Sequence, residues 1–140
     1  MTNDCIFCKI IAGELPAKKV YEDDNCLAFM DINPVTKGHT LVIPKKHFED
    51  IMNTPDDLLG KVIAAARKVA LAQKNGLHAD AVNVTQANGQ LAGQIIPHIH
   101  FHIIPRLQND PESHGWTHSK YKDDAEMNSY AEKIAGAIKQ

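Results

Sequence analysis

Three histidines alternate with hydrophobic residues within residues 97–105, and this segment restricts the possible folds more than any other feature of the chain. In a β-strand, successive side chains point to opposite faces of the sheet. A strand here therefore places His98, His100 and His102 on one face, roughly 6.6 Å apart at twice the rise per residue. The alternating apolar residues face the other way, toward a hydrophobic core: Ile99, Phe101 and Ile103.

Four further segments have the composition of strands and are bounded by turn-forming residues. They cover residues 20–22, 26–32, 39–44 and 81–85. The first three follow one another across short turns, which predicts an antiparallel meander. A polar loop with two glycines, residues 86–94, joins the fourth segment to the histidine strand and is a candidate ligand cradle.

Three segments have the periodicity of amphipathic helices. A short helix is predicted over residues 5–11, and a C-terminal helix runs from about residue 123 to residue 138. The central helix opens with Thr54 as its cap and Pro55 at its first helical position, and Asn75-Gly76 closes it.

Runs of strands with helices grouped around them are typical of the α+β class, because parallel sheets require strict alternation of strand and helix. The chain has 140 residues and is 44% hydrophobic, which suits one domain with one core. We therefore expect a single domain over residues 1–140. It should contain a mainly antiparallel five-stranded sheet, a short N-terminal helix, a central helix and a C-terminal helix.

Composition excludes several classes of partner. A formal net charge of -2 and a pI of about 6.4 give no broad basic field, so no nucleic-acid polymer is expected to bind. The chain has no run of 18 apolar residues and no signal-peptide pattern at its start, so no membrane association is expected. Its 3 cysteines argue against a secreted disulfide scaffold. These features predict a soluble, cytoplasmic protein.

Two chemistries are compatible with three neighbouring imidazoles. Like charges disfavour protonation, so at least one histidine should be neutral and nucleophilic. One interpretation is the metal site of a His-x-His zinc hydrolase, and the other is nucleophilic attack on phosphorus. A zinc hydrolase normally needs a carboxylate near the metal-bound water, and no Asp or Glu lies between Asp80 and Asp110. This favours phosphorus chemistry.

Cysteine spacing gives a second motif, Cys5-x-x-Cys8, on the predicted first helix. The spacing alone is compatible with half of a zinc site, a redox dithiol or coincidence. A zinc site would need two further ligands. Cys26 lies in an apolar strand and is interpreted as a buried core thiol.

The chain resembles the histidine triad (HIT) family, whose three histidines alternating with hydrophobic residues are matched over residues 98–104. The similarity extends to residues 5–11, to the Asp31-Ile32 pair, to residues 39–47 and to residues 92–94. It is most similar to the bacterial, cysteine-containing branch of the family.

This resemblance implies an enzyme acting at the α-phosphorus of purine nucleoside phosphoramidates. His100 would attack the phosphorus and carry a nucleotidyl intermediate, while His102 and His39 would stabilise charge on the phosphate. Asp31, with Ile32 beside it, would bind the ribose hydroxyls of the nucleotide. The resemblance implies further substrate contacts from four residues: Phe7, Asn88, Gly93 and Gln94.

The resemblance also implies a zinc site made of Cys5, Cys8, His47 and His98. Such a site would be structural, tying the first helix to the sheet and holding His98, and the chemistry itself would require no cofactor. Family members commonly pair as twofold dimers through a continuous sheet, so the expected partners are a purine nucleotide substrate and a second copy of the chain.

Two positions depart from the family pattern: Ile95, where Ser or Thr is frequent, and Ala87, where Asn or Gln is frequent. Both lie where the leaving group would be recognised. Two alternatives therefore stay open, a dinucleoside polyphosphate hydrolase and a nucleotide-binding regulatory module with weak catalysis. Trp116 and Tyr121, after the triad, are compatible with three roles: covering a substrate, packing at a subunit contact, or ordinary packing within the domain.

Overall fold

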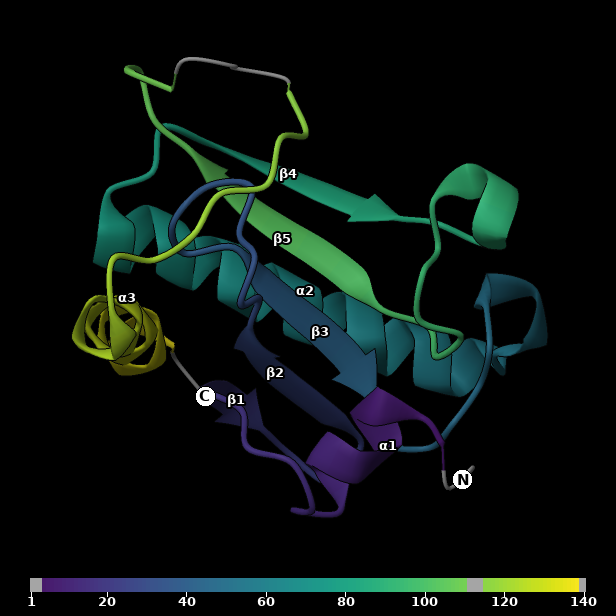
Figure 1. The fold of residues 1–140 in the computed structure, drawn as a ribbon. Helices are drawn as coiled ribbons and strands as arrows, with labels where there is room; N and C mark the ends of the chain where they lie inside the picture. The colour runs from purple at the N-terminus through teal and green to yellow at the C-terminus, as the bar shows by residue number, and fades with distance from the viewer. Residues whose placement is uncertain (1–3, 111–114, 139–140) are drawn as a thin grey trace.

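The computed structural model describes residues 4–110 and 115–138, which form a five-stranded sheet with helices on both faces (Figure 1). The strand order is β1-β2-β3-β5-β4, and every neighbouring pair is antiparallel. The predicted α+β class and the five-stranded antiparallel sheet are confirmed. The strands are β1 (Lys19–Glu22), β2 (Cys26–Met30), β3 (Thr40–Pro44), β4 (Ala81–Gln86) and β5 (Phe101–Arg106).

Three α-helices cover the two faces of this sheet: α1 (Ile6–Ile11), α2 (Asp56–Leu77) and α3 (Asp124–Ala137). Helices α2 and α3 share one hydrophobic core with one face, and α1 shares a second core with the opposite face, beside β2 and β3 (Figure 1). Alternate residues of β2 and β3 enter the two cores, so both strands are buried along their whole length. The strand residues in the α1 core are Leu27, Phe29, Leu41 and Ile43.

Helix α2 starts later than the sequence predicts. Pro55 is its N-cap and Asp56 its first residue, and the Thr54 hydroxyl donates to the Asp50 carbonyl at 2.7 Å rather than capping the helix. The prediction of Thr54 as the cap is therefore wrong. Asp56 and Asp57 do lie in the first turn, where carboxylates are stabilised by the helix dipole.

The end of α2 is also later than predicted. The helix continues through Asn75 and Gly76 to Leu77, and His78 ends it in the left-handed conformation at φ 57°. Gly76 is needed inside the helix because a Cβ there would collide with the Lys133 carbonyl of α3. The glycine permits close helix packing instead of forming the cap, a distinction that a sequence pattern does not make.

The histidine strand is shorter than predicted, because β5 begins at Phe101 rather than near residue 97. Pairing with both β3 and β4 starts only at Phe101. Before Phe101, the Ile99 N–H donates to the Phe48 carbonyl at 2.8 Å. Residues 97–100 therefore lie beside a loop and not beside a neighbouring strand.

The alternation of faces nevertheless continues through this segment. The residues between the histidines lie in the core with α2 and α3, as predicted: Ile99, Phe101 and Ile103. On the other face α1 covers part of the sheet, so His98 and His100 are buried rather than lining an open surface. The sequence pattern predicts the shared face of the three histidines but not this burial.

Other boundaries differ by one or two residues from the prediction: β2 ends at Met30 and β3 begins at Thr40. In α3, Asp123 is the N-cap and accepts the Glu126 N–H at 2.8 Å. Within residues 4–110 and 115–138, no helix has the length and apolar character needed to cross a membrane.

Candidate active site and metal cluster

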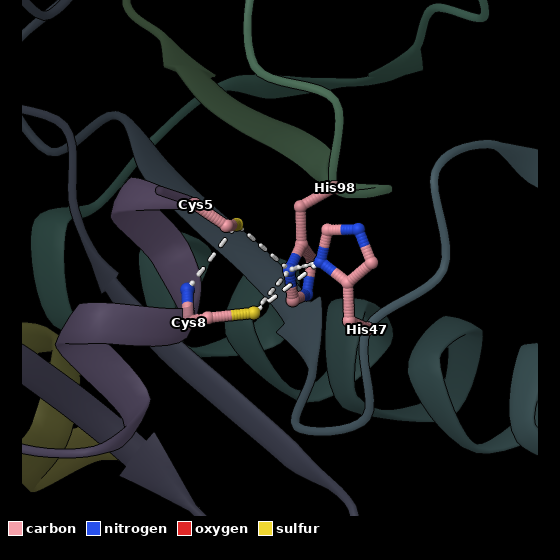
Figure 2. A group of neighbouring side chains, drawn as sticks. All are labelled: Cys5, Cys8, His47 and His98. Atoms are coloured by element: carbon pink, nitrogen blue, oxygen red, sulfur yellow. Dashed lines mark hydrogen bonds between the residues drawn. The ribbon is translucent and has the colours of Figure 1, made fainter. Parts of the chain in front are cut away.

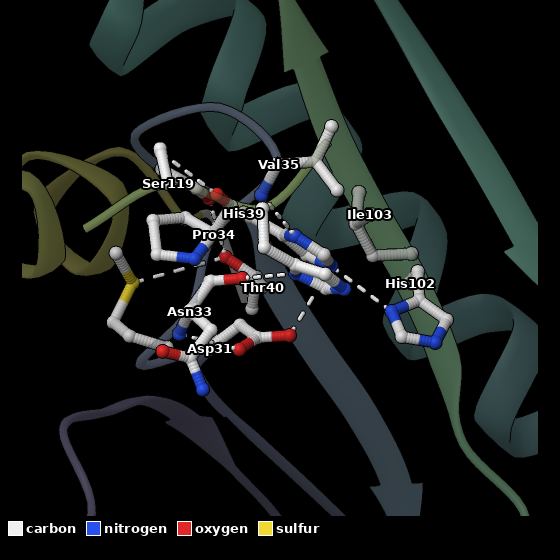
Figure 3. Close-up of polar contacts among 12 residues, drawn as sticks. Asp31, Asn33, Pro34, Val35, His39, Thr40, His102, Ile103 and Ser119 are labelled. Atoms are coloured by element: carbon white, nitrogen blue, oxygen red, sulfur yellow. Dashed lines mark hydrogen bonds and ion pairs between the residues drawn. The ribbon is translucent and has the colours of Figure 1, made fainter. Parts of the chain in front are cut away.

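The sheet face that carries α1 also carries a hydrogen-bonded pair of imidazoles (Figure 3). His39 directly precedes β3, and His102 pairs with Leu41, so the two histidines are diagonal neighbours on one face. His39 Nε2 lies 2.9 Å from His102 Nδ1, and His39 Nδ1 accepts the Val35 N–H at 3.0 Å. His39 therefore carries its hydrogen on Nε2 and donates it to His102 Nδ1, which leaves the His102 hydrogen on Nε2.

His100 has the opposite tautomer. Its Nδ1 lies 2.8 Å from the His98 carbonyl oxygen, and a carbonyl oxygen can only accept a hydrogen bond. Nδ1 therefore carries the hydrogen, and Nε2 keeps its lone pair. The ring centroids of His100 and His102 lie 5.0 Å apart, and His100 is 8% exposed. This arrangement suits a nitrogen nucleophile.

Burial keeps these imidazoles neutral at pH 7. Burial first, and neighbouring imidazoles second, lower the pKa of His39 to about 3 and that of His102 to about 4. Burial also lowers the pKa of His100, against the opposing effects of its hydrogen bond to His98 and of the Asp31 charge. A neutral His100 offers its lone pair without prior loss of a proton.

Asp31 lies just after β2, beside the imidazole pair (Figure 3). Its Oδ2 is 3.6 Å from His39 Nε2, and its Oδ1 accepts the Asn33 N–H at 2.8 Å. The carboxylate thus forms a turn and faces the histidines at the same time, and burial raises its pKa. The adjacent Ile32 is 71% exposed and extends into solvent. Asp31 therefore lies next to the imidazole pair.

Phe7 of α1 packs against two side chains of the histidine segment. Its ring makes edge-to-face contacts with His100 at 5.2 Å and with His98 at 5.8 Å between centroids. Phe7 is 5% exposed, so its neighbours are side chains and not solvent. Helix α1 consequently supports the position of both histidines, whatever contact Phe7 makes with a substrate.

The loop predicted as a ligand cradle, residues 86–94, is held by the side chain of Gln94. Its Oε1 accepts the Gly89 N–H at 2.7 Å, and its amide nitrogen donates to the carbonyls of Glu49 and Ile96. Gln94 is 7% exposed. In this conformation the Gln94 side chain shapes the loop, and its hydrogen-bonding groups point to the backbone.

Asn88 and Gly93 also shape this loop. Asn88 Oδ1 accepts the Ile51 N–H at 2.8 Å, and the Asn88 amide donates to Gln86 Oε1 at 2.7 Å. Gly93 has a φ of 100°, which side-chain-bearing residues rarely adopt. Ile95, one of the two departures from the family pattern, is 83% exposed directly after the loop. The loop therefore presents an apolar side chain to solvent at this position.

The four predicted metal ligands converge at one end of α1 (Figure 2). His98 Nδ1 lies 3.5 Å from Cys5 Sγ and 3.6 Å from Cys8 Sγ. His47 Nδ1 lies 3.3 Å from Cys8 Sγ and 3.2 Å from His98 Nδ1. In all, one ligand atom from each residue lies within 4.8 Å of the others. The arrangement joins α1, the loop after β3 and the histidine segment.

These separations fit a tetrahedral zinc ion. Zinc bonds of about 2.3 Å to sulfur and about 2.0–2.1 Å to nitrogen place tetrahedral ligands about 3.6 Å apart for a sulfur–nitrogen pair and about 3.3 Å for two nitrogens. His98 Nε2 lies 2.9 Å from the Pro44 carbonyl, so Nε2 carries the hydrogen and Nδ1 is left as a donor to a metal. The chemistry of the donor set and its geometry agree.

A second group of metal-capable side chains comprises Asp31, His39 and His102, whose ligand atoms also lie within 4.8 Å of one another. Here the hydrogen-bonding partners disfavour coordination. The Val35 N–H occupies His39 Nδ1, so Nε2 carries the hydrogen and has no lone pair for a metal. The two clusters are therefore prepared for different tasks.

Trp116, which the sequence analysis offers as a cover for a substrate or as a packing residue, lies against the imidazole pair. Its ring centroid lies 5.0 Å from that of His102 and 6.0 Å from that of His39, and it is 45% exposed. The N–H and hydroxyl of Ser119 both donate to the Pro34 carbonyl, which fastens this segment beside Asp31 (Figure 3). Tyr121 instead accepts the Gly38 N–H.

The groups that fix the ring tautomers are backbone atoms that sequence reasoning does not find. They are the Val35 N–H, the His98 carbonyl and the Pro44 carbonyl. Every non-proline residue carries an N–H and every residue a carbonyl, so no residue type signals them. Only the folded chain shows which of them reach an imidazole.

Comparison with known proteins gives a consistent result. The sequence pattern of the HIT domain matches residues 12–109. An uncharacterised HIT-like protein from Methanocaldococcus jannaschii is 55% identical over 109 residues, covering 77% of this chain and 83% of that protein. An adenosine 5′-monophosphoramidase from Candida albicans is 41% identical over 106 residues, covering 73% and 70%. A zinc-bound histidine triad protein from Mycobacterium smegmatis matches with a TM-score of 0.86 at 36% identity, covering 96% and 92%.

Proposed function

This chain belongs to the HIT family, and on that premise we propose that it is a nucleotide hydrolase acting at the α-phosphorus of purine nucleoside phosphoramidates. The observation that carries the proposal is the hydrogen bond from His100 Nδ1 to the His98 carbonyl, which leaves a lone pair on Nε2. The similarity to an adenosine 5′-monophosphoramidase supports the substrate class.

In the first displacement, His100 Nε2 forms a bond to phosphorus and the bond from phosphorus to the leaving amine breaks. The amine departs with a proton from water, and the positive charge of the modified imidazole is shared with the His98 carbonyl through Nδ1–H. In the second displacement, a second water forms a bond to phosphorus, the bond to His100 breaks, and that water gives a proton to the hydroxide left by the first step. The products are a nucleoside monophosphate and the original imidazole.

Negative charge on the phosphoryl oxygens would be stabilised by His102, whose hydrogen lies on Nε2. His39 fixes this tautomer by donating to His102 Nδ1 at 2.9 Å, so it acts on the phosphate through His102 as well as by its position. Donors fixed before the reaction pay no reorganisation cost, and one such donor is typically worth about a hundredfold to a thousandfold in rate.

We assign nucleoside binding to Asp31 and Ile32. The Asp31 carboxylate lies 3.6 Å from His39 and accepts only one backbone N–H in the described structure, which leaves acceptor capacity for ribose hydroxyls. Ile32 is exposed and offers an apolar surface for the base. For Phe7, Asn88, Gly93 and Gln94, the proposal is a role in shaping the walls of the site, because their described contacts are with the protein.

Zinc is the metal that the Cys5, Cys8, His47 and His98 cluster suits best. We assign the ion a structural role, and the chemistry itself requires no cofactor. When bound, it would cross-link α1 to the segment that holds His98, whose carbonyl in turn holds His100. A reducing compartment such as the cytoplasm would keep both cysteines as ligands, and we expect the working form to be a homodimer.

Trapping the intermediate tests the proposal. Purified protein is incubated with an adenosine phosphoramidate, quenched in mild alkali to preserve the phosphorus–nitrogen bond, and weighed by intact mass spectrometry. We expect an adenylyl adduct in the wild type and in His78→Asn, whose histidine is exposed and far from the triad in sequence. The adduct and turnover should both be absent in His100→Ala.

Different outcomes separate the alternatives. Unchanged turnover in His100→Ala would contradict the mechanism. Tight binding of AMP with no turnover in the wild type would favour a regulatory nucleotide-binding module. A higher kcat/KM for diadenosine polyphosphates than for the phosphoramidate, under equal conditions, would assign the protein to polyphosphate hydrolysis and retain the same nucleophile.

A further inference from the structure

Gln73 is a fully buried amide on an otherwise apolar face of α2. It is 0% exposed, and the other buried side chains of this helix are small and apolar: Val62, Ala65, Ala66, Val69 and Ala72. A buried amide costs free energy unless it is hydrogen-bonded. The contacts that Gln73 makes therefore explain why such a residue is compatible with this position.

The Gln73 amide donates to the backbone beside both imidazoles, just before β3 on one side and within β5 on the other. Nε2 donates to the Gly38 carbonyl at 3.0 Å and to the Ile103 carbonyl at 2.9 Å. Gly38 directly precedes His39, and Ile103 directly follows His102. One side chain thus links the backbone neighbours of both histidines across the sheet.

This link lies where the sheet itself stops holding the two strands together. The β3–β5 register runs from Val42 opposite Phe101 to Thr40 opposite Ile103. His39 and Gly38 lie beyond its last pair, so no pairing within that register fixes their distance from β5. Gln73 provides a hydrogen-bonded bridge at this open end.

The Gln73 amide nitrogen makes two hydrogen bonds whereas its oxygen makes none among the described residues, and this difference supports a role for the nitrogen. Gln73 Oε1 is buried and has no hydrogen-bond partner among the described residues. An unsatisfied buried acceptor costs free energy. A purely apolar side chain would avoid this cost, so the amide is disfavoured at this position unless its two donors provide something that packing alone does not.

We propose that Gln73 is a positioning residue that sets the distance between His39 and His102, and thereby the His102 tautomer that faces the phosphate. The bridge acts on the backbone on both sides of a 2.9 Å imidazole–imidazole hydrogen bond. Its effect on catalysis rests on the proposed function, whereas its effect on the histidine pair does not.

Gln73→Met tests this role, because methionine has a similar length and no donor. We expect a folded protein with a lowered melting temperature, because the Gly38 and Ile103 carbonyls each lose a donor, although the unsatisfied Oε1 is removed with the amide. We expect kcat to fall about tenfold at unchanged KM, because a small displacement of a catalytic group is costly. In nitrogen-15 NMR spectra, the His39 Nε2–H signal should broaden or shift.

Val69→Ala is the matched control, because Val69 is equally buried on the same helix and does not contact either carbonyl through a polar group. It should lower the melting temperature and leave both kcat and the His39 signal unchanged. An unaltered His39 signal in Gln73→Met, or in Gln73→Leu if the methionine variant does not fold, would overturn the proposal. A changed signal in a protein without turnover would uphold the positioning role and reject the proposed function instead.

Discussion

The two histidine clusters use similar side chains on the same part of the sheet, yet backbone contacts prepare them for opposite tasks. In the cysteine cluster, the Pro44 carbonyl accepts a hydrogen bond from His98 Nε2. The Nδ1 nitrogen, which faces the sulfurs, therefore carries a lone pair. In the His39–His102 pair, the Val35 N–H donates to His39 Nδ1, so Nε2 carries the ring hydrogen and donates to His102. A carbonyl hydrogen-bonded to one ring nitrogen leaves a lone pair on the other, for a metal at His98 or an electrophile at His100, and an N–H in that place leaves a donor.

The clusters are nevertheless connected, because His98 belongs to both regions. Its ring faces the metal cluster, and its backbone carbonyl accepts the hydrogen of His100. Phe7 packs against the rings of both His98 and His100. The comparison therefore predicts that removing a ligand of the Cys5, Cys8, His47 and His98 cluster also disturbs His100. Substitution of His39 or His102 should leave that cluster intact.

The largest expected effect follows from removing a metal ligand. Cys8→Ala should reduce zinc content from one equivalent to near zero and lower the free energy of unfolding by several kcal/mol, because structural zinc binding supplies on the order of 10 kcal/mol. Elemental analysis and thermal unfolding with and without a chelator measure this. Cys26→Ala, a buried thiol outside the cluster, is the control and should retain full zinc.

Removing the catalytic donor should have a large effect on rate alone. His102→Ala is expected to lower kcat by about a hundredfold to a thousandfold, through loss of a preorganised donor. Zinc content should stay at the wild-type value, because His102 is not among the four clustered ligands. Loss of zinc in this variant would break the distinction between the clusters.

Acid should destabilise the catalytic pair through its own titration. His39 and His102 have folded pKa values of about 3 and about 4, below the ordinary value of 6.5. Their contribution is therefore complete above pH 6.5 and is lost as pH falls toward pH 4, by up to about 1.4 kcal/mol per pH unit for each group. The raised pKa of Asp31 acts in the opposite direction at low pH.

Denaturant unfolding at a series of pH values checks this expectation. The free energy of unfolding should fall less steeply below pH 6.5 in His102→Ala than in wild type, since one of the titrating groups is gone. Equal slopes in the two proteins would show that His102 is protonated equally in the folded and unfolded states.

Substitution of Asp31, the residue proposed to bind the ribose, should have a smaller effect. Asp31→Asn should raise KM for an adenosine phosphoramidate about tenfold, because hydrogen bonds to a charged group are worth on the order of 1.5–3 kcal/mol. A 2′,3′-dideoxyadenosine analogue should show the same KM with both proteins. Equal increases for both substrates would place Asp31 in charge stabilisation near His39 instead of ribose binding.

The smallest expected effect concerns thiol reactivity. Burial raises the pKa of Cys26 to about 11, so it should resist iodoacetamide at pH 8 in the folded protein. After chelation, Cys5 and Cys8 should become the sites of alkylation, which peptide mass mapping detects. Modification of Cys26 ahead of these two residues would show that its strand opens.

Much of this fold follows from local patterns, because the strands and helices have clear periodicity. The errors occur at ends. Thr54 has the composition of a cap but donates to Asp50, and Gly76 has the composition of a helix end but enables contact with α3. The sequence predicts the start of β5 too early, because a strand forms only where a neighbouring strand pairs with it. Residues 97–100 lie beside the loop that contains Phe48.

The candidate site shows the same division. The resemblance to the HIT family named the residues of both clusters, and they converge in space. Gln73 was not found, because an amide in an amphipathic helix gives no signal that it bridges two strands. Asn88 and Gln94 were assigned to substrate contact, and only the folded loop reveals their bonds to the backbone.

By itself, the sequence determined which side chains share a face, because the period of a strand is set by covalent geometry. It thereby placed three imidazoles on the face opposite Ile99, Phe101 and Ile103, whereas the meeting of two thiols with His98 was implied only by the resemblance to the HIT family. Tertiary structure alone decided which nitrogen of each ring carries the hydrogen, because that depends on whether a backbone carbonyl or N–H lies behind the ring. It also decided that α1 covers the histidine face beside β2 and β3, and burial there is what keeps the imidazoles neutral.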